Sequence, residues 1–133
     1  TYKNSKILSA TNYYYKVAAY KEVDGKNYIG AQCDRIKATT NPLQPRVTLS
    51  TTTKKVKLTY DSKVSKRTDG YEIYMATSKN GTYKLIKDTD KTYYTKSSLT
   101  SKKVYYFKVR AYRTVDGQKV YSLYSLPKYI KVK

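Results

Sequence analysis

Residues 105–117 read YYFKVRAYRTVDG, and this stretch decides the fold. Along it, mainly apolar side chains alternate with basic and aromatic ones: Tyr105, Phe107, Val109 and Ala111 against Tyr106, Lys108, Arg110 and Tyr112. Because successive side chains of a strand point to opposite faces, the alternation predicts a half-buried strand with one cationic, solvated face. The Asp116-Gly117 pair that ends the stretch predicts a tight hairpin turn with a positive φ at the glycine.

A second copy of this stretch lies 92 residues earlier. Residues 13–25 read YYYKVAAYKEVDG, and nine of these thirteen positions are identical to residues 105–117. A period of 92 residues is longer than the roughly 20–50 residues of solenoid repeats and suits a β-sandwich of about 100 residues. We therefore expect the end of one domain followed by the whole of the next.

The rest of the chain also favours short strands. Residues 56–60, 71–75 and 83–86 have strand patterns, and Asp69-Gly70 and Asn80-Gly81 between them predict turns. No ten-residue helical period occurs. The polar run at residues 39–45 contains two prolines and predicts a linker, which puts the domain boundary near residue 42.

From about Pro45 to Lys133 the sequence resembles a fibronectin type III domain, of the kind repeated in secreted and surface proteins of Gram-positive, clostridial-type bacteria. The resemblance is carried by VKLTY at 56–60, DGYEIYMATSKNGTYKLI at 69–86, the YYFKVRAY strand six residues after Leu99, the VDG hairpin and YSLYS at 121–125. It implies an all-β, immunoglobulin-like antiparallel β-sandwich. Residues 43–133 would form one complete copy, and residues 1–42 would be strands E, F and G of a preceding copy.

The resemblance also implies structural roles for individual residues. Tyr105, and Tyr13 in the first copy, would be tyrosine-corner residues, whose hydroxyls bond back to the backbone upstream. Tyr60 stands where the family usually has a buried Trp. Leu8 precedes Tyr13 by only five residues, which implies an E–F turn one residue shorter in the first copy.

Residues 1–42 lack the partner strands of a sandwich, and an isolated hairpin is marginally stable in water. We expect the missing strands to come from a segment upstream of Thr1, or from another copy of the chain by strand exchange through residues 1–42.

The composition argues against an enzyme. The chain has no His and one Cys, so it can form no Ser-His-Asp triad, zinc site or internal disulfide. The carboxylates Glu22, Asp61, Asp69 and Glu72 have no spacing that would pair them for catalysis. Asp88 and Asp90 fall short of the six to eight oxygens that calcium takes. We expect no catalytic residue, no metal and no cofactor.

The single cysteine, Cys33, falls in the predicted last strand of the first copy, roughly where Leu126 lies in the second. We expect it to be a small core residue rather than a reactive thiol.

The net charge of +19 is concentrated in residues 43–133, which carry 21 basic and 6 acidic side chains. Such a surface attracts anionic glycans and cell-wall polymers, although the charge also serves solubility. The predicted outward face could gather rings and cations that bind a glycan or polyanion: Tyr74, Tyr106, Lys108, Arg110 and Tyr112. Equally, Tyr and Lys could simply pair across strands and stabilise an exposed sheet. No nucleic-acid-binding motif occurs, so we do not expect DNA or RNA as a partner.

These observations lead to two hypotheses of function. The first is a noncatalytic extracellular spacer or adhesion module, built from tandem domains that contact their neighbours in a bacterial surface or secreted protein. The alternative is an accessory module of a secreted hydrolase that binds glycans or cell-wall polyanions through the Tyr/Lys face.

Overall fold

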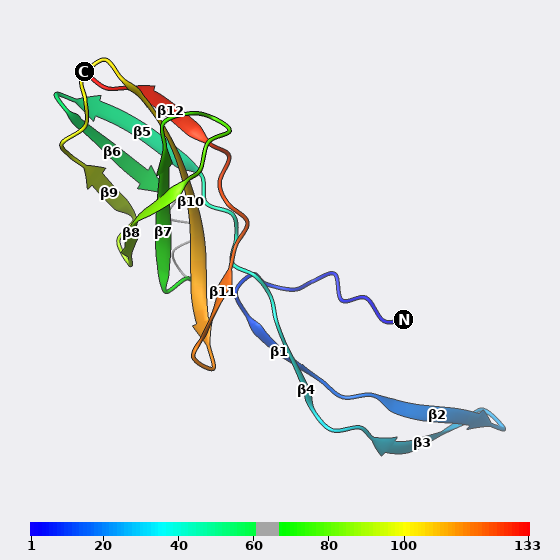
Figure 1. Cartoon of the computed structure of the whole chain (residues 1–133). Coiled ribbons are helices and arrows are strands. Elements are labelled where there is room, and N and C mark those ends of the chain that lie inside the picture. The colour runs from blue at the N-terminus through cyan, green and yellow to red at the C-terminus, as the bar shows by residue number, and fades with distance from the viewer. Residues whose placement is uncertain (61–66) are drawn as a thin grey trace. The chain divides into compact units, whose positions relative to one another are not determined.

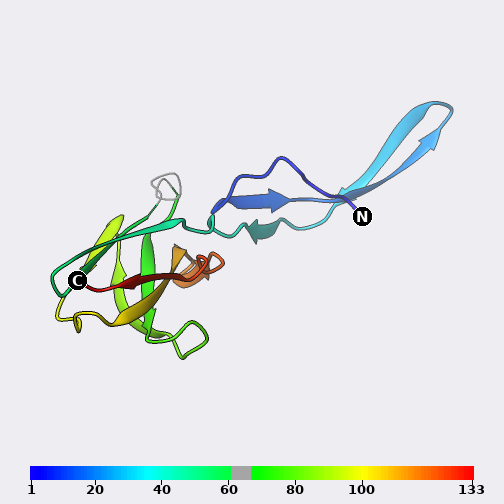
Figure 2. The ribbon, with the colours of Figure 1, turned by 90° about the horizontal axis from the view of Figure 1, so that it is seen from above.

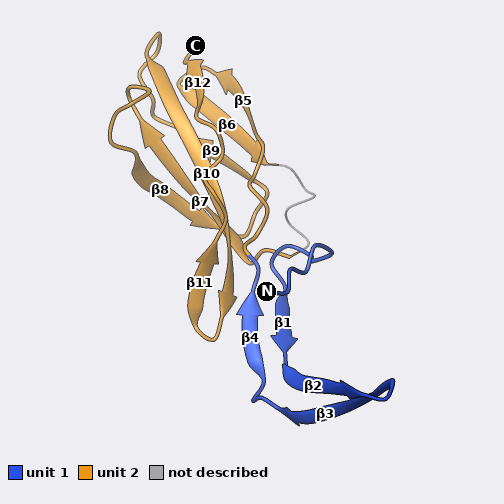
Figure 3. Cartoon of the chain, turned by 90° about the vertical axis from the view of Figure 1, so that its right-hand side faces the viewer, with its two compact units in different colours: residues 1–40 blue, residues 41–133 orange. Residues whose placement is uncertain are grey.

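The computed structural model describes residues 1–60 and 67–133, which form two compact units, Thr1–Thr40 (unit 1) and Asn41–Lys133 (unit 2) (Figure 3). The division falls two residues before the boundary predicted near residue 42. Within the described ranges every regular element is a β-strand and none is a helix. Asp61, one of the carboxylates considered above, lies outside the described residues.

Unit 2 consists of two antiparallel sheets (Figure 1). One has the order β5-β6-β9; the other has the order β11-β10-β7-β8, with β12 also paired to β10. The strands are β5 (Val47–Thr52), β6 (Lys55–Tyr60), β7 (Gly70–Ala76), β8 (Lys84–Thr89), β9 (Tyr93–Lys96), β10 (Val104–Val115), β11 (Gln118–Tyr121) and β12 (Lys128–Lys131). The predicted antiparallel β-sandwich is thus confirmed.

The core lies between these sheets and follows the alternation read from β10. Phe107, Val109 and Ala111 are fully buried, whereas the residues between them remain partly exposed. They pack in one cluster with the inward side chains of the other strands. Tyr60 and Tyr71 belong to this cluster, with ring centroids 4.9 Å apart. Tyrosine therefore fills the place for which the resemblance implies a tryptophan.

The two predicted Asp-Gly turns have different structures. At Asp116-Gly117 both residues have positive φ, 51° and 77°, so the predicted tight turn is confirmed. Gly70, in contrast, is already the first residue of β7, and its φ is not positive. A Cβ on Gly70 would lie 2.5 Å from the hydroxyl oxygen of Tyr112. This glycine is therefore needed to make room for a ring, and the sequence prediction gave the wrong reason for it.

Unit 1 is a long hairpin. β1 (Asn12–Tyr15) pairs with β4 (Ile36–Thr39), and β2 (Ala18–Val23) pairs with β3 (Lys26–Gln32) farther along the same two chain segments (Figure 2). Residues 1–11 form no strand, so the prediction of a strand E in this segment is wrong. In unit 2 the corresponding strand β9 forms by pairing with β6, and unit 1 has no strand of that kind.

The hairpin of unit 1 repeats that of unit 2 residue for residue at an offset of 92. Tyr13 pairs with Ala38 as Tyr105 pairs with Ile130, and every other Cα pair of β1 and β4 has its counterpart in β10 and β12. The pairs at the hairpin end of β2 and β3 likewise match those of β10 and β11. Local sequence therefore sets the same register in both units.

The turn before each hairpin also matches. Ala10 and Lys102, 92 residues apart, both have positive φ, 49° and 64°. The prediction that this turn is one residue shorter in the first copy is therefore wrong, because Ile7 rather than Leu8 is the counterpart of Leu99.

The same register corrects the prediction for Cys33. Its counterpart is Ser125, not Leu126: Cys33 N donates to Val17 O at 2.8 Å, and Ser125 N donates to Val109 O at 2.7 Å. Ser125 is buried in unit 2, whereas Cys33 is exposed, because nothing within unit 1 covers that face of the hairpin. The expectation of a core cysteine was therefore wrong for unit 1 as it stands.

Candidate functional site

The outward face of β7, β10 and β11 carries most of the predicted rings and cations of unit 2. The antiparallel register puts Lys108 opposite Tyr74 and Arg110 opposite Glu72. Because directly opposite side chains on one face lie about 5 Å apart, this pairing brings cations from β10 against a ring and a carboxylate from β7.

Glu72 is the centre of this face. Its Oε2 accepts hydrogen bonds from the Tyr74 hydroxyl at 2.7 Å and from Arg110 Nε at 2.9 Å, and Arg110 Nη2 lies 2.8 Å away. Its Oε1 accepts from Lys119 Nζ at 3.1 Å and from the Tyr121 hydroxyl at 3.0 Å. Only 5% of Glu72 is exposed. A nearly buried carboxylate is thus satisfied by two cations and two hydroxyls from three strands.

These contacts change the pKa of Glu72. Burial alone would raise the pKa, but the hydrogen bonds from Tyr74, Arg110, Lys119 and Tyr121 favour the ionised form and together outweigh burial. The net effect lowers the pKa from 4.5 to about 2. Glu72 is therefore ionised at neutral pH and serves as a fixed anion, not as a proton donor or acceptor.

Lys108 is surrounded by rings. Its Nζ lies 4.1 Å from the ring centroid of Tyr124, 4.5 Å from that of Tyr83 and 6.0 Å from that of Tyr74. Tyr74 and Tyr124 meet edge to face with centroids 5.3 Å apart. Cation–π contacts of this kind stabilise an ammonium group without a carboxylate, and no carboxylate of the described residues forms an ion pair with Lys108.

Lys119 and Arg110 each form both an ion pair with a carboxylate and a cation–π contact with a ring. Lys119 Nζ lies 2.6 Å from Asp88 Oδ2 and 3.9 Å from the ring centroid of Tyr112, whose hydroxyl donates to Asp88 at 2.8 Å. The guanidinium of Arg110 lies 3.6 Å from the ring centroid of Tyr121. Rings and cations therefore alternate across the face, and the two acidic side chains neutralise Arg110 and Lys119.

Of the five residues predicted for this face, Tyr74, Lys108 and Arg110 lie together around Glu72 and Tyr124. Tyr112 joins them through Lys119 and Asp88. Tyr106 instead packs against Tyr129 of β12, with centroids 5.6 Å apart.

The sequence analysis missed more than half of the face, namely Glu72, Tyr83, Asp88, Lys119, Tyr121 and Tyr124. A signal was available for Glu72, since it is the only acidic residue in the 71–75 strand pattern and lies opposite Arg110 once the strands are aligned. For Lys119 and Tyr121, the alternation could have been continued through the turn at Asp116-Gly117.

The two predicted tyrosine-corner residues make equivalent hydrogen bonds. The Tyr105 hydroxyl accepts from the backbone N–H of Thr100 at 3.3 Å, and the Tyr13 hydroxyl accepts from the N–H of Leu8 at 2.6 Å. Hydrogen bonding from Thr100 lowers the pKa of Tyr105, chiefly through the Thr100 side chain and less through its backbone N–H, because both favour the phenolate oxygen as acceptor.

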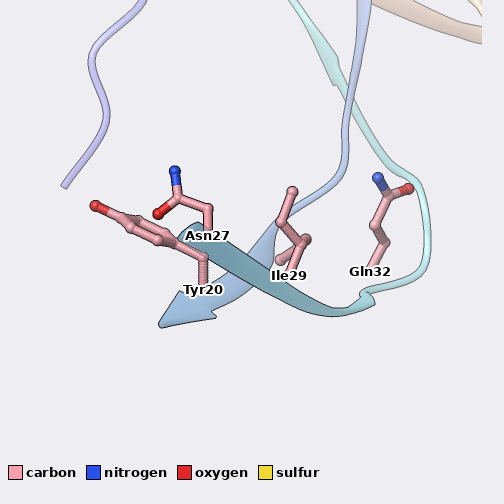
Figure 4. A pocket seen from close by; sticks show the side chains of 5 residues that line it. Tyr20, Asn27, Ile29 and Gln32 are labelled. Atoms are coloured by element: carbon pink, nitrogen blue, oxygen red, sulfur yellow. The ribbon is translucent and has the colours of Figure 1, made fainter. Parts of the chain in front are cut away.

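Unit 1 has a hollow whose lining residues lie 92 positions before residues on the outward face of unit 2. It is lined by Ala18, Tyr20, Asn27, Ile29 and Gln32, and the four larger side chains project to the same side of the β2–β3 hairpin (Figure 4). None of these residues is charged.

No group of three or more His, Cys, Asp or Glu in the described ranges is arranged to hold a metal ion. No helix there is long and apolar enough to cross a membrane.

Comparison with known proteins identifies the fold. No family model matches the sequence, and no curated protein matches it significantly. Among solved structures, an Fn3-like protein from Clostridium thermocellum is 21% identical, with a TM-score of 0.57 over 69% of this chain and 94% of its own. A structure described as a myokine is 19% identical, with a TM-score of 0.55 over 69% of this chain and 98% of its own. These similarities, with the two sheets described above, show that the chain has the fibronectin type III fold.

Proposed function

We propose that the chain is a noncatalytic structural module that acts as a spacer in a secreted or cell-surface bacterial protein. The observation that carries this proposal is that the charged groups on the outward face of β7, β10 and β11, which we call the ring-and-cation face, already have partners within the unit. Arg110 and Lys119 already neutralise Glu72 and Asp88, and Lys108 is already held among three rings. A face whose charges are satisfied internally stiffens a sheet and has little left to offer a ligand.

The path of the chain through unit 2 also suits a spacer. Gln44, near the start of the unit, donates a hydrogen bond to the backbone of Tyr124. At the other end of β5, Lys54 N donates to Lys133 O at 3.1 Å, so the last residue lies beside the β5–β6 turn. A strand of six residues spans roughly 20 Å. The chain therefore enters toward one end of the sandwich and leaves at the other (Figure 1).

The competing function is binding of anionic glycans or cell-wall polymers. One observation favours it: Lys108 lies among aromatic rings without a carboxylate from the described residues, and rings beside a cation are the elements that bind an acidic sugar.

Retention on purified wall teichoic acid and peptidoglycan separates the two functions. For a spacer we expect weak retention at about 0.02 M salt that disappears near 0.15 M, as nonspecific attraction does when it is screened. Lys108→Glu should then weaken retention no more than Lys87→Glu, which makes the same charge change at an exposed residue of β8. Saturable retention near 0.15 M that is lost in Lys108→Glu and kept in Lys87→Glu would contradict the spacer and establish the alternative.

A further inference from the structure

Unit 1 leaves exposed a surface whose counterpart within unit 2 is covered by a second sheet. Val17 and Val109 are 92 residues apart, and each donates its N–H to a side chain 16 residues later, Cys33 at 3.1 Å and Ser125 at 3.0 Å. Val109 is fully buried beneath the β5-β6-β9 sheet, whereas 66% of Val17 is exposed. The same inward face is thus present in both units and lacks its covering sheet in unit 1.

The edge of the hairpin is uncovered as well. In unit 2 residues 106–112 pair with β7, and β10 runs without interruption. No strand among the described residues pairs with the corresponding edge at residues 14–20. The strand is broken there, since Lys16 and Val17 lie between β1 and β2. An edge of this kind accepts an added strand through its backbone groups.

The side chains along this edge determine which strand fits. Five residues that hold or adjoin Glu72 in unit 2 have uncharged counterparts in unit 1, whereas Lys108 is matched by another lysine, Lys16. Arg110, Tyr112, Lys119, Tyr121 and Tyr124 correspond to Ala18, Tyr20, Asn27, Ile29 and Gln32, the lining of the hollow in Figure 4. A carboxylate opposite Ala18 would therefore lose both cations and the Tyr121 hydroxyl.

The lack of partners for a carboxylate opposite Ala18 argues against a second copy of the chain as the source of the strand. A second copy would bring β7 with Glu72 opposite Ala18, and burying a carboxylate without its partners is strongly unfavourable. It would also have to withdraw β7, including the fully buried Ile73, from its own core. Tyr20, in contrast, is retained at the position of Tyr112, whose ring requires Gly70 on the paired strand.

We propose that unit 1 is a docking surface for β-strands from the polypeptide segment that precedes Thr1. The strand that pairs with residues 14–20 carries glycine opposite Tyr20 and, two residues later, an uncharged residue opposite Ala18. Between and after them it carries apolar residues, as Tyr71 and Ile73 of β7 do. This proposal concerns unit 1 alone and stands whether or not unit 2 is a spacer.

A chimera tests the proposal with strands of known sequence. Because Thr1 corresponds to Tyr93, a copy of residues 43–92 placed before Thr1 supplies unit 1 with counterparts of β5 to β8 in register. Two versions are compared, one with Glu72 retained in the added copy and one with Glu72→Leu there, while unit 2 is unchanged in both.

We expect the leucine version to slow amide exchange at Lys16 and Ala18, whose counterparts Lys108 and Arg110 pair with β7, by at least about 100-fold relative to the 133-residue chain, and to do so more than the glutamate version. Equal protection in both versions, or more in the glutamate version, would overturn the proposal. So would protection of these amides in the 133-residue chain through dimerisation, since the second copy would then be the partner.

The natural sequence before Thr1 is a second readout that does not depend on folding of the chimera. A strand pattern with glycine about 40 residues before Ala18, as Gly70 lies before Arg110 in the repeat, and with an uncharged residue two positions after that glycine, supports the proposal. A segment without a strand pattern, or one with Asp or Glu at that position, contradicts it.

Discussion

Val17 and Val109 occupy the same position in two copies of one hairpin, and they differ only in what surrounds them. The turn residues, the register and the hydrogen bond to a side chain 16 residues later are the same in both. Burial and strand continuity are not, since Val109 lies in an unbroken strand under a second sheet and Val17 lies in a gap between strands. Local sequence therefore sets the hairpin, and the partner strands provide its burial.

The largest expected difference between the units comes from the inward aromatic ring. Phe107→Ala opens a cavity in the closed core of unit 2 and should cost about 3–5 kcal/mol of unfolding free energy. Tyr15→Ala, at the counterpart position in the uncovered hairpin, should change the unfolding free energy of unit 1 by less than about 0.5 kcal/mol. Urea unfolding followed by near-ultraviolet circular dichroism measures both, and comparable losses would show that unit 1 also has a closed core.

The next effect concerns Glu72, which lies on a strand of unit 2 that has no counterpart in unit 1. Glu72→Gln leaves Arg110 and Lys119 without their shared anion and should lower the stability of unit 2 by about 2–4 kcal/mol at pH 7. Asp90→Asn, an exposed acidic residue of the same unit, is the matched control and should change stability by less than about 0.5 kcal/mol. If the two variants were equally stable, the contacts of Glu72 would contribute nothing measurable.

The pH dependence sharpens the same point. The pKa of Glu72 is lowered from 4.5 in the unfolded chain to about 2 in the folded protein, so its stabilisation is complete above about pH 4.5. It should be lost as the pH falls from there toward 2, and the loss should be smaller in Glu72→Gln than in the unsubstituted chain. Parallel pH profiles for the two proteins would contradict the assigned role.

A smaller effect is expected at the side chain that accepts the valine amide. Ser125→Ala leaves the N–H of Val109 without its acceptor in a buried position and should cost about 1–2 kcal/mol. Cys33→Ala removes the equivalent acceptor from an exposed position, where water replaces it, and should change stability by a few tenths of a kcal/mol at most. Thermal unfolding of both variants checks the ratio, and a larger loss for Cys33→Ala would reverse the comparison.

The fold of unit 2 could be predicted because its signals are local. Alternation along residues 105–112 fixed the buried face, and Asp116-Gly117 fixed the turn. The errors arose where a distant strand decides the outcome. Gly70 looked like a turn glycine because the ring of Tyr112, 42 residues away, cannot be seen in the local sequence.

The ring-and-cation face was only partly predictable for the same reason. The alternation found Lys108 and Arg110 on one face, but Glu72 became part of it only through the register between β7 and β10. Cys33 looked like a core residue because its strand pattern is that of a buried strand, and burial depends on a sheet that unit 1 lacks.

Native-state hydrogen exchange of the 133-residue chain tests the central claim most directly, by comparing the amides of Val17 and Val109. If the hairpin is locally encoded but buried only in unit 2, Val109 should exchange only on global unfolding of unit 2. Val17 should then exchange within about a hundredfold of the unstructured rate. Equal protection of the two amides in a monomeric sample would contradict this account.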